Sequence, residues 1–148
     1  MIAESKRLGV VVDMAKREED KAAALLDEKR NALVAEEIRL NDLKEYYEEY
    51  ETQFKQTTKI LRAEDFAKNR NFLHQLSQSC DLQNTQVAHA QLAVDKAIEE
   101  WRKVHLKLEK LRDHVSRLKL AEIADQDKQE QKRVDEWVTQ AYVRKDTR

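Results

Sequence analysis

The sequence predicts an all-α protein, a long antiparallel two-helix coiled-coil hairpin in which the second helix overhangs the first. Three observations support this prediction. The 148 residues include no proline and a single glycine, and these residue types normally mark turns and helix ends. Charged residues make up 39% of the chain, as is usual for long solvated helices. Apolar residues recur at heptad spacing in two separate runs, which is the pattern of a coiled-coil interface.

Composition and charge also argue against several classes of function. Lys and Arg number 28 and Asp and Glu 29, for a formal net charge of -1. A nucleic-acid binder would instead concentrate positive charge on one face. No apolar run is long enough to span a bilayer, and the single cysteine, Cys80, fits a reducing compartment. We therefore expect a cytoplasmic protein that binds no nucleic acid and does not insert directly into a membrane.

The first heptad run predicts a helix over about residues 4–56. With Leu8 at heptad position d, the register continues without insertion as far as Phe54, and eleven of its fourteen a and d positions are apolar. This face should form one side of a coiled coil. The fourteen positions are Leu8, Val12, Ala15, Glu19, Ala22, Leu26, Lys29, Leu33, Glu36, Leu40, Leu43, Tyr47, Tyr50 and Phe54.

A chain reversal is predicted at about residues 57–62. The two registers are twelve residues apart, from Phe54 to Phe66, whereas coiled coils tolerate insertions of three or four. Thr57 and Thr58 are poor residues for the middle of a helix and plausible helix caps. A reversal near residue 60 pairs residue i with roughly residue 120−i, so that Leu8 should lie opposite about residue 112.

The second heptad run predicts a helix over about residues 63–143. Its a and d positions run from Phe66 to Leu118, and among them Asn69 and Gln83 are polar. Cys80 and Trp101 both fall on this seam, so core packing is the favoured interpretation of their side chains.

Beyond about residue 119 the seam pattern ends, and the segment 119–143 is predicted to overhang the first helix. A new apolar stripe appears there with the spacing of one helical face. It consists of Val134, Trp137, Val138, Ala141 and Tyr142. Because the first helix is too short to cover this stripe, it should bind another molecule. The alternative is a frayed, disordered terminus.

We find no pattern of catalytic or cofactor-binding residues. The chain has no phosphate-binding glycine loop, and its four histidines and single cysteine lack metal-ligand spacing. His105 and His114 are expected on solvated faces of the second helix. The sequence therefore predicts no enzyme, no cofactor and no metal site.

Four segments resemble the FliJ family, the small helical-hairpin components of the bacterial flagellar type III export apparatus. The most discriminating is the stretch "QKRVDEW", followed by an alanine and a basic end, which resembles the signature that closes these proteins. The resemblance covers essentially the whole chain. The four segments are Ser5–Ala23, Phe66–Leu76, Ile98–Asp113 and Gln131–Trp137.

Family resemblance implies that the ends of the hairpin enter the hexameric export ATPase ring, as the central stalk does in rotary ATPases, and promote its assembly and hydrolysis. Trp137 would then be the apolar anchor of the interface, flanked by charged residues, as is common in interface hot spots. The implied ATPase-binding residues are Leu8, Val12, Gln131, Lys132, Val134, Asp135, Glu136 and Trp137.

The resemblance also implies docking on the cytoplasmic linker of the membrane export gate. Tyr46 and Phe72 fall off the predicted seam, so their rings should be partly exposed, whereas seam packing is the favoured interpretation of Tyr50 and Leu76. Residues 46 and 50 should lie near residues 74 and 70. The implied gate-binding residues are Leu43, Tyr46, Tyr50, Phe72 and Leu76.

Further implications concern other partners and location. Family members handle emptied export chaperones, and they act in the cytoplasm, peripherally associated with the inner membrane at the flagellar basal body. Two alternatives remain open from the sequence. One is the corresponding stalk protein of a virulence type III secretion system. The other is a generic homodimeric coiled coil that serves as a structural spacer.

Overall fold

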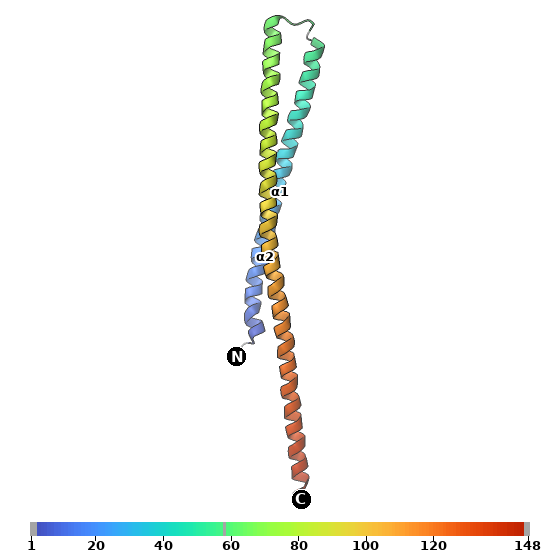
Figure 1. The fold of residues 1–148 in the computed structure, drawn as a ribbon. Helices are drawn as coiled ribbons and strands as arrows, with labels where there is room; N and C mark the ends of the chain where they lie inside the picture. Colours follow the sequence, from blue (N-terminus) through green and yellow to red (C-terminus); the bar gives the residue numbers. More distant parts are fainter. Residues whose placement is uncertain (1–2, 58, 147–148) are drawn as a thin grey trace. The chain divides into compact units, whose positions relative to one another are not determined.

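Two helices account for nearly all of the chain in this computed structural model, which describes residues 3–57 and 59–146. Helix α1 spans Glu4–Thr57 and helix α2 spans Ala63–Asp146. They run antiparallel and pack against each other, and the described residues contain no strand (Figure 1). The predicted fold class, an all-α antiparallel two-helix hairpin with a C-terminal helical overhang, is confirmed.

The chain divides into two compact units. The turn unit is Asp20–Lys103 and contains the reversal. The terminal unit combines the described residues up to Glu19 with those from Val104 onward. In each unit a segment of α1 packs on a segment of α2, and each is described by itself below.

Packing in the turn unit follows the heptad pattern. Its core is formed by Leu26, Val94 and Ala97, and Trp101 packs against this core. Cys80 is half-buried on the same seam. Core packing is therefore confirmed as the role of the Trp101 side chain, because a heptad seam turns the same face of each helix toward its partner.

Two polar seam residues of the turn unit, Gln83 and Glu36, bond to each other. Gln83, predicted as a polar seam residue of the second helix, donates from Nε2 to the backbone carbonyl of Glu36 at 3.0 Å and also to the Glu36 carboxylate. Glu36 in turn receives a salt bridge from Arg39 at 3.2 Å. The pair keeps two polar side chains bonded within an apolar interface, where an unbonded polar group would be costly.

Hydrogen bonds define where the helices end at the reversal. The Thr57 hydroxyl donates to the Gln53 carbonyl at 2.9 Å, and the Ile60 amide donates to the Thr57 carbonyl at 3.0 Å. The Arg62 carbonyl accepts the first bond of α2, from the Phe66 amide at 2.9 Å. Thr57 is thus the last residue of α1, and Thr58, the other predicted cap, lies outside the described residues.

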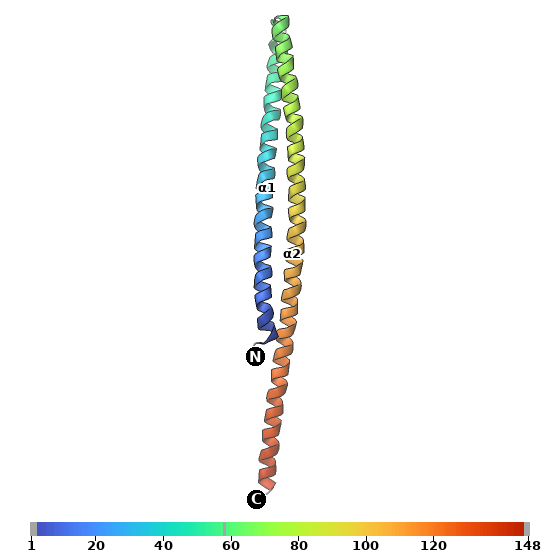
Figure 2. The same cartoon turned by 90° about the vertical axis from the view of Figure 1, so that its left-hand side faces the viewer.

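In the terminal unit the interface ends on a polar contact. Ala15 is buried and Leu108 is fully buried, and the seam of α2 remains partly covered as far as Glu122. From Ile123 to Asp146 every residue is exposed. The uncovered segment therefore starts at Ile123 rather than near residue 119, and the helix continues to Asp146 rather than 143. In Figures 1 and 2 this end of α2 runs past the start of α1 without a neighbour.

The interface extends beyond residue 119 because Glu122 contacts the first turn of α1 and caps that helix. The Ala3 carbonyl accepts the first helical bonds of α1, from Lys6 and Arg7, so Ala3 occupies the N-cap position but has no oxygen on its side chain. The Glu122 carboxylate takes over this function: it accepts the Ser5 amide at 3.1 Å and the Ser5 hydroxyl at 2.7 Å. A carboxylate at a helix N-terminus is also favoured by the helix dipole.

The expected pairing of residue i with 120−i holds in the turn unit but not in the terminal unit. Phe54 and Phe66 stack with centroids 5.2 Å apart, as that relation requires. Ser5, however, bonds to Glu122 rather than lying near residue 115, so Leu8 does not face residue 112. Part of this offset arises because long side chains on a helix lean toward the N-terminus of that helix. The Glu122 carboxylate therefore lies closer to the start of α2 than its own Cα does.

Candidate partner-binding surfaces

The first candidate surface is the overhang stripe, which consists of Val134, Trp137, Val138, Ala141 and Tyr142. The Trp137 side chain is 70% exposed and Tyr142 is 69% exposed. Apolar side chains that recur every three or four residues share one face of a helix. Nothing in the described chain covers this face, so it is available to a partner.

Polar side chains flank the stripe. Gln131, Lys132, Asp135 and Glu136, all implied in ATPase binding, lie on exposed turns of α2 around Trp137. Charged residues around a large aromatic anchor are typical of an interface hot spot and its rim.

Leu8 and Val12, the other implied ATPase-binding residues, are half-buried on the interface of the terminal unit. Their first role is thus to pack α1 on α2. The exposed apolar residues of this segment are instead Val10 at 62% and Met14 at 58%. The sequence pattern contained this signal, because both residues fall off the heptad seam.

A shallow groove lies between the two helices of the terminal unit. Gly9 contributes to its floor, and a Cβ added at Gly9 would meet no atom within 4 Å. This opening allows a neighbouring chain to approach the backbone of α1 closely. The groove, called here the N-terminal groove, is lined by Lys6, Gly9, Val10, Val12, Asp13, Arg112, Val115, Ser116 and Lys119.

A second candidate surface, in the turn unit, is the aromatic cluster of Tyr46, Tyr50 and Phe72. The Tyr50 and Phe72 ring centroids are 4.5 Å apart, and Tyr46 meets Phe72 edge-on at 6.4 Å. Tyr46 is 47% exposed and Phe72 is 37% exposed. The structure thus brings together three of the five implied gate-binding residues, and two of them present ring surface to solvent.

The remaining two implied gate-binding residues pack inward. Leu76 is buried and Leu43 is half-buried on the seam. They therefore do not extend the exposed surface of the aromatic cluster.

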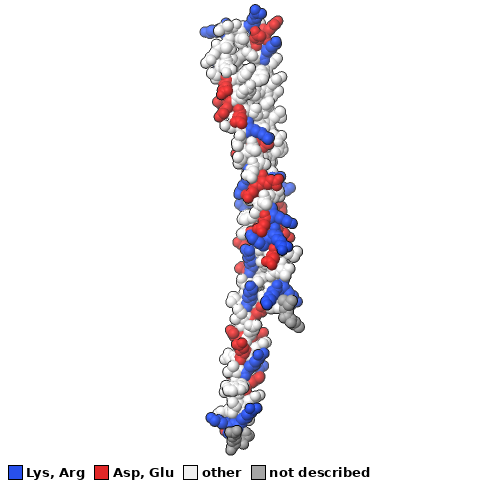
Figure 3. Space-filling model, turned by 180° about the vertical axis from the view of Figure 1, so that it is seen from behind, with Lys and Arg blue, Asp and Glu red and all other residues white. Residues whose placement is uncertain are grey.

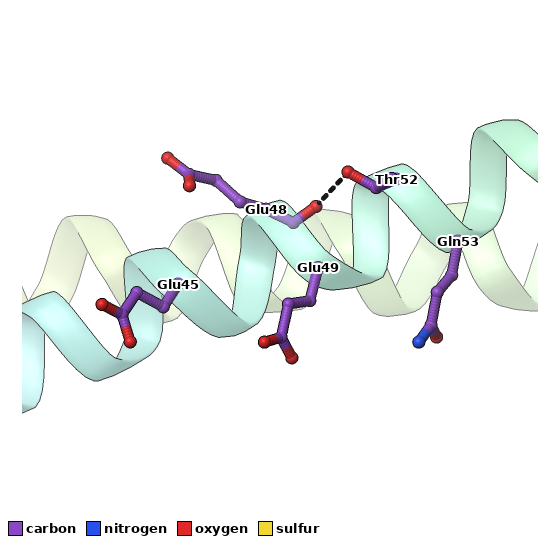
Figure 4. A pocket seen from close by; sticks show the side chains of 5 residues that line it. All are labelled: Glu45, Glu48, Glu49, Thr52 and Gln53. Carbon is purple, nitrogen blue, oxygen red and sulfur yellow. Dashed lines mark hydrogen bonds between the residues drawn. The ribbon is translucent and has the colours of Figure 1, made fainter.

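An acidic strip lies next to the aromatic cluster on α1. Glu45 and Glu49 point to one side of α1 and Glu48 to the other, as Figure 4 shows, and the Thr52 hydroxyl donates to the Glu48 carbonyl at 2.8 Å. The strip was not singled out from the sequence, where these glutamates look like ordinary helix-surface residues.

His105 makes a polar contact between the helices, contrary to the expectation that it lies on a solvated face. Its Nδ1 is 2.9 Å from Glu19 Oε2, and its Nε2 is 3.0 Å from Glu109 Oε1. The hydrogen bond with Glu19 raises the pKa of His105 above its ordinary value of 6.5. The same bond, helped by Lys16 at 3.1 Å, lowers the pKa of Glu19. Glu19 occupies a seam position, but the pairing of residue i with 120−i places residue 101 rather than His105 opposite it, so the sequence did not reveal this contact.

Charge on the remaining surface is mixed. On the face drawn in Figure 3, basic and acidic side chains are interspersed along the molecule. Among residues 3–57 and 59–146 no helix is long and apolar enough to cross a membrane. The same residues include no group of three or more His, Cys, Asp or Glu side chains placed to hold a metal ion.

Comparison with known proteins agrees with the resemblance in the four segments. The chain is 26% identical to the flagellar FliJ protein of Salmonella typhi and 25% identical to that of Escherichia coli strain K12. Each match covers 97% of this chain and 99% of the relative. The family profile described as "Flagellar FliJ protein" matches residues 5–147. This match spans nearly the whole sequence, and the chain belongs to the FliJ family.

Proposed function

We propose that this protein is a non-enzymatic component of flagellar protein export. In this proposal the overhang stripe binds the hexameric export ATPase as a central stalk, and the aromatic cluster docks on the cytoplasmic linker of the export gate. The two surfaces lie in different units of one chain, so a single protein could couple the ATPase to the membrane gate. This would place it in the cytoplasm, peripherally associated with the inner membrane at the basal body, where it would also meet export chaperones.

The overhang stripe is the observation that carries the ATPase proposal. A long helix that leaves Trp137 and Tyr142 about 70% exposed has no intramolecular reason to keep these side chains. A narrow apolar sleeve, such as the centre of an ATPase ring, would bury them from all sides. The acidic and basic residues around Trp137 would then bond to polar groups at the mouth of the sleeve.

The ATPase proposal is tested by the hydrolysis rate of the cognate export ATPase with and without this protein. We expect wild type to stimulate hydrolysis and Trp137→Ala to abolish most of the stimulation. Val143→Ala is the matched control. Val143 is also exposed, but at nine residues from Val134 it lies on the opposite face of the helix from the stripe. Equal loss in both variants, or no stimulation by wild type, would reject the stripe as the effector surface.

The gate proposal rests on the exposed rings of Tyr46 and Phe72. It is tested by binding of a peptide that contains the cytoplasmic linker. Tyr46→Ala should weaken binding about tenfold, the effect of losing one hot-spot side chain. Ile38→Ala, an exposed apolar residue elsewhere on α1, should bind like wild type. If both variants bind equally well, the linker docks elsewhere.

The virulence-secretion alternative is disfavoured by the flagellar family match. The homodimeric spacer needs both heptad seams for a second chain, whereas here the seams are occupied by each other. Neither alternative has an observation in its favour.

A further inference from the structure

The exposed face of α2 carries a third heptad series that the hairpin does not use. Starting at Ser116, its members alternate spacings of four and three residues, as the a and d positions of a coiled coil do. All eight are exposed. The series is Ser116, Leu120, Ile123, Asp127, Glu130, Val134, Trp137 and Ala141.

This series lies on a different side of α2 from the hairpin seam. At about 100° per residue, it is rotated by roughly 120° from the seam that contains Val115, Leu118 and Glu122. That rotation explains why α1 covers Glu122 but leaves Leu120 at 68% and Ile123 at 55% exposure. The series spans 116–141, a length of about 38 Å at 1.5 Å per residue, and comprises more than three heptads.

The series reads the same in both directions in chemical terms. Positions equally far from its two ends carry residues of the same kind. The outermost two, Ser116 and Ala141, are small, and the next two, Leu120 and Trp137, are large and apolar. The next pair, Ile123 with Val134, is β-branched on both sides. The central pair, Asp127 with Glu130, is acidic. A palindromic pattern is what a two-fold interface between identical antiparallel helices requires, since each residue must suit its counterpart in the other copy.

We infer that the occupant of this face is a second copy of the chain, bound antiparallel about a two-fold axis midway between Asp127 and Glu130. In this pairing Leu120 packs on the second copy's Trp137 and Ile123 on its Val134. Both apolar ends of the series are then buried at the same time. Among antiparallel registers only this one brings all the apolar members together, since a shift of one heptad sets Leu120 against Glu130 or Trp137 against Asp127.

The N-terminal groove fits the same arrangement. Ser116 and Lys119 line this groove together with Gly9 and Val10 of α1. In the antiparallel dimer the end of the second copy's overhang, with its small Ala141, reaches this level of α2. The missing side chain at Gly9 leaves open space there, and the exposed Val10 offers the incoming helix a further apolar contact.

The acidic centre keeps the dimer weak. Asp127 and Glu130 of both copies meet at the two-fold axis, and like charges that lose water there oppose association. Lys128 and Arg133 of each copy flank this layer and compensate it partly. Neutralising one acidic residue of the series by substitution should therefore tighten the dimer.

Sedimentation equilibrium of the full-length chain over a concentration series tests the dimer. Asp127→Asn should strengthen self-association about tenfold, and Trp137→Ala should weaken it. Asp125→Asn is the matched control, since the same charge is removed two residues away on the opposite face of the helix. The inference fails if Asp127→Asn remains monomeric at the highest concentration, or if both Asn variants associate equally.

Orientation is tested by disulfide trapping in a Cys80→Ala background. A mixture of Ile123→Cys and Val134→Cys chains should cross-link, because these residues face each other across the antiparallel pair. Neither variant should cross-link alone, since two Ile123 positions are about 16 Å apart along the axis. Cross-linking of Ile123→Cys with itself would overturn the antiparallel register.

This inference does not rest on the proposed ATPase binding, because sedimentation needs no ATPase. Both interfaces use Trp137, so the dimer would hold the effector surface closed until a partner competes for it. If the chain dimerises but does not stimulate an ATPase, only the proposed function fails. If it stimulates an ATPase but never dimerises, only the present inference fails.

Discussion

His105 of α2 bonds to Glu19 of α1 through Nδ1 at 2.9 Å, while its Nε2 lies 3.0 Å from Glu109. A neutral imidazole has one N–H, whereas the imidazolium has two and can donate to both carboxylates at once. The contact ties the two helices together within the terminal unit. It is therefore strongest when the ring is protonated.

Stability should depend on pH through this contact. The raised pKa of His105 gives a stabilisation that is complete below the ordinary value of 6.5 and is lost as pH rises through the folded-state pKa. The lowered pKa of Glu19 gives a second stabilisation, which is complete above the ordinary value of 4.5 and is lost as pH falls through the folded-state pKa. Both contributions are present between about pH 4.5 and 6.5.

Thermal unfolding of His105→Gln at two pH values measures this effect. The melting temperature should fall below that of wild type by more at pH 6 than at pH 9. His89→Gln, which replaces an exposed histidine of α2, should shift little at either pH. A pH-independent difference for His105→Gln would mean that the ring acts by packing alone.

Leu108 should be the most sensitive apolar position of the terminal unit. Its side chain is fully buried, so Leu108→Ala removes methyl groups and leaves a cavity, at a cost of about 2–5 kcal/mol. Leu106→Ala makes the same chemical change two residues away at a side chain that is 53% exposed, and should cost about 0.5 kcal/mol or less. Urea unfolding followed by circular dichroism gives both values, and similar losses would contradict the assigned register.

Glu122 should control fraying of α1. Glu122→Gln keeps the shape but loses the charge that favours the helix N-terminus, so the Ser5 amide should exchange with solvent severalfold faster. Hydrogen bonds from Ser5 lower the pKa of Glu122 below its ordinary value of 4.5. The cap should therefore persist above pH 4.5 and be lost as pH falls through the folded-state pKa. Unchanged exchange at Ser5 in Glu122→Gln would show that the cap is unimportant in solution.

Gln83 and Glu36 should be coupled. Gln83→Ala removes the donor that bonds Glu36 across the seam and should cost about 1–2 kcal/mol. Replacing both residues by leucine should restore or raise the free energy of unfolding, because apolar residues pack in the seam without needing a partner. A double-mutant cycle of Gln83→Leu, Glu36→Leu and the double variant, measured by urea unfolding, checks this, and purely additive changes would exclude the coupling.

Much of the fold could be predicted from the order of residues alone. Covered side chains follow the a and d positions from Leu8 to Phe54 and from Phe66 to Leu118, since a heptad repeat is a local pattern that fixes which face is buried. The exposure of Trp137 and the partial exposure of the Tyr46 ring could be predicted for the same reason. The polar contacts could not, because each depends on two distant residues and on the exact register of one helix against the other.

Residue spacing and composition establish that this protein is two long helices, which faces they bury, and that an apolar stripe remains beyond their interface. These properties follow from local spacing and composition. Tertiary structure alone decided that α1 is capped by Glu122, that His105 meets Glu19, and that Leu8 and Val12 pack inward beside an open groove. Side chains from segments about 90 to 120 residues apart meet only once the helices are aligned, and an offset of a few residues changes every such pair.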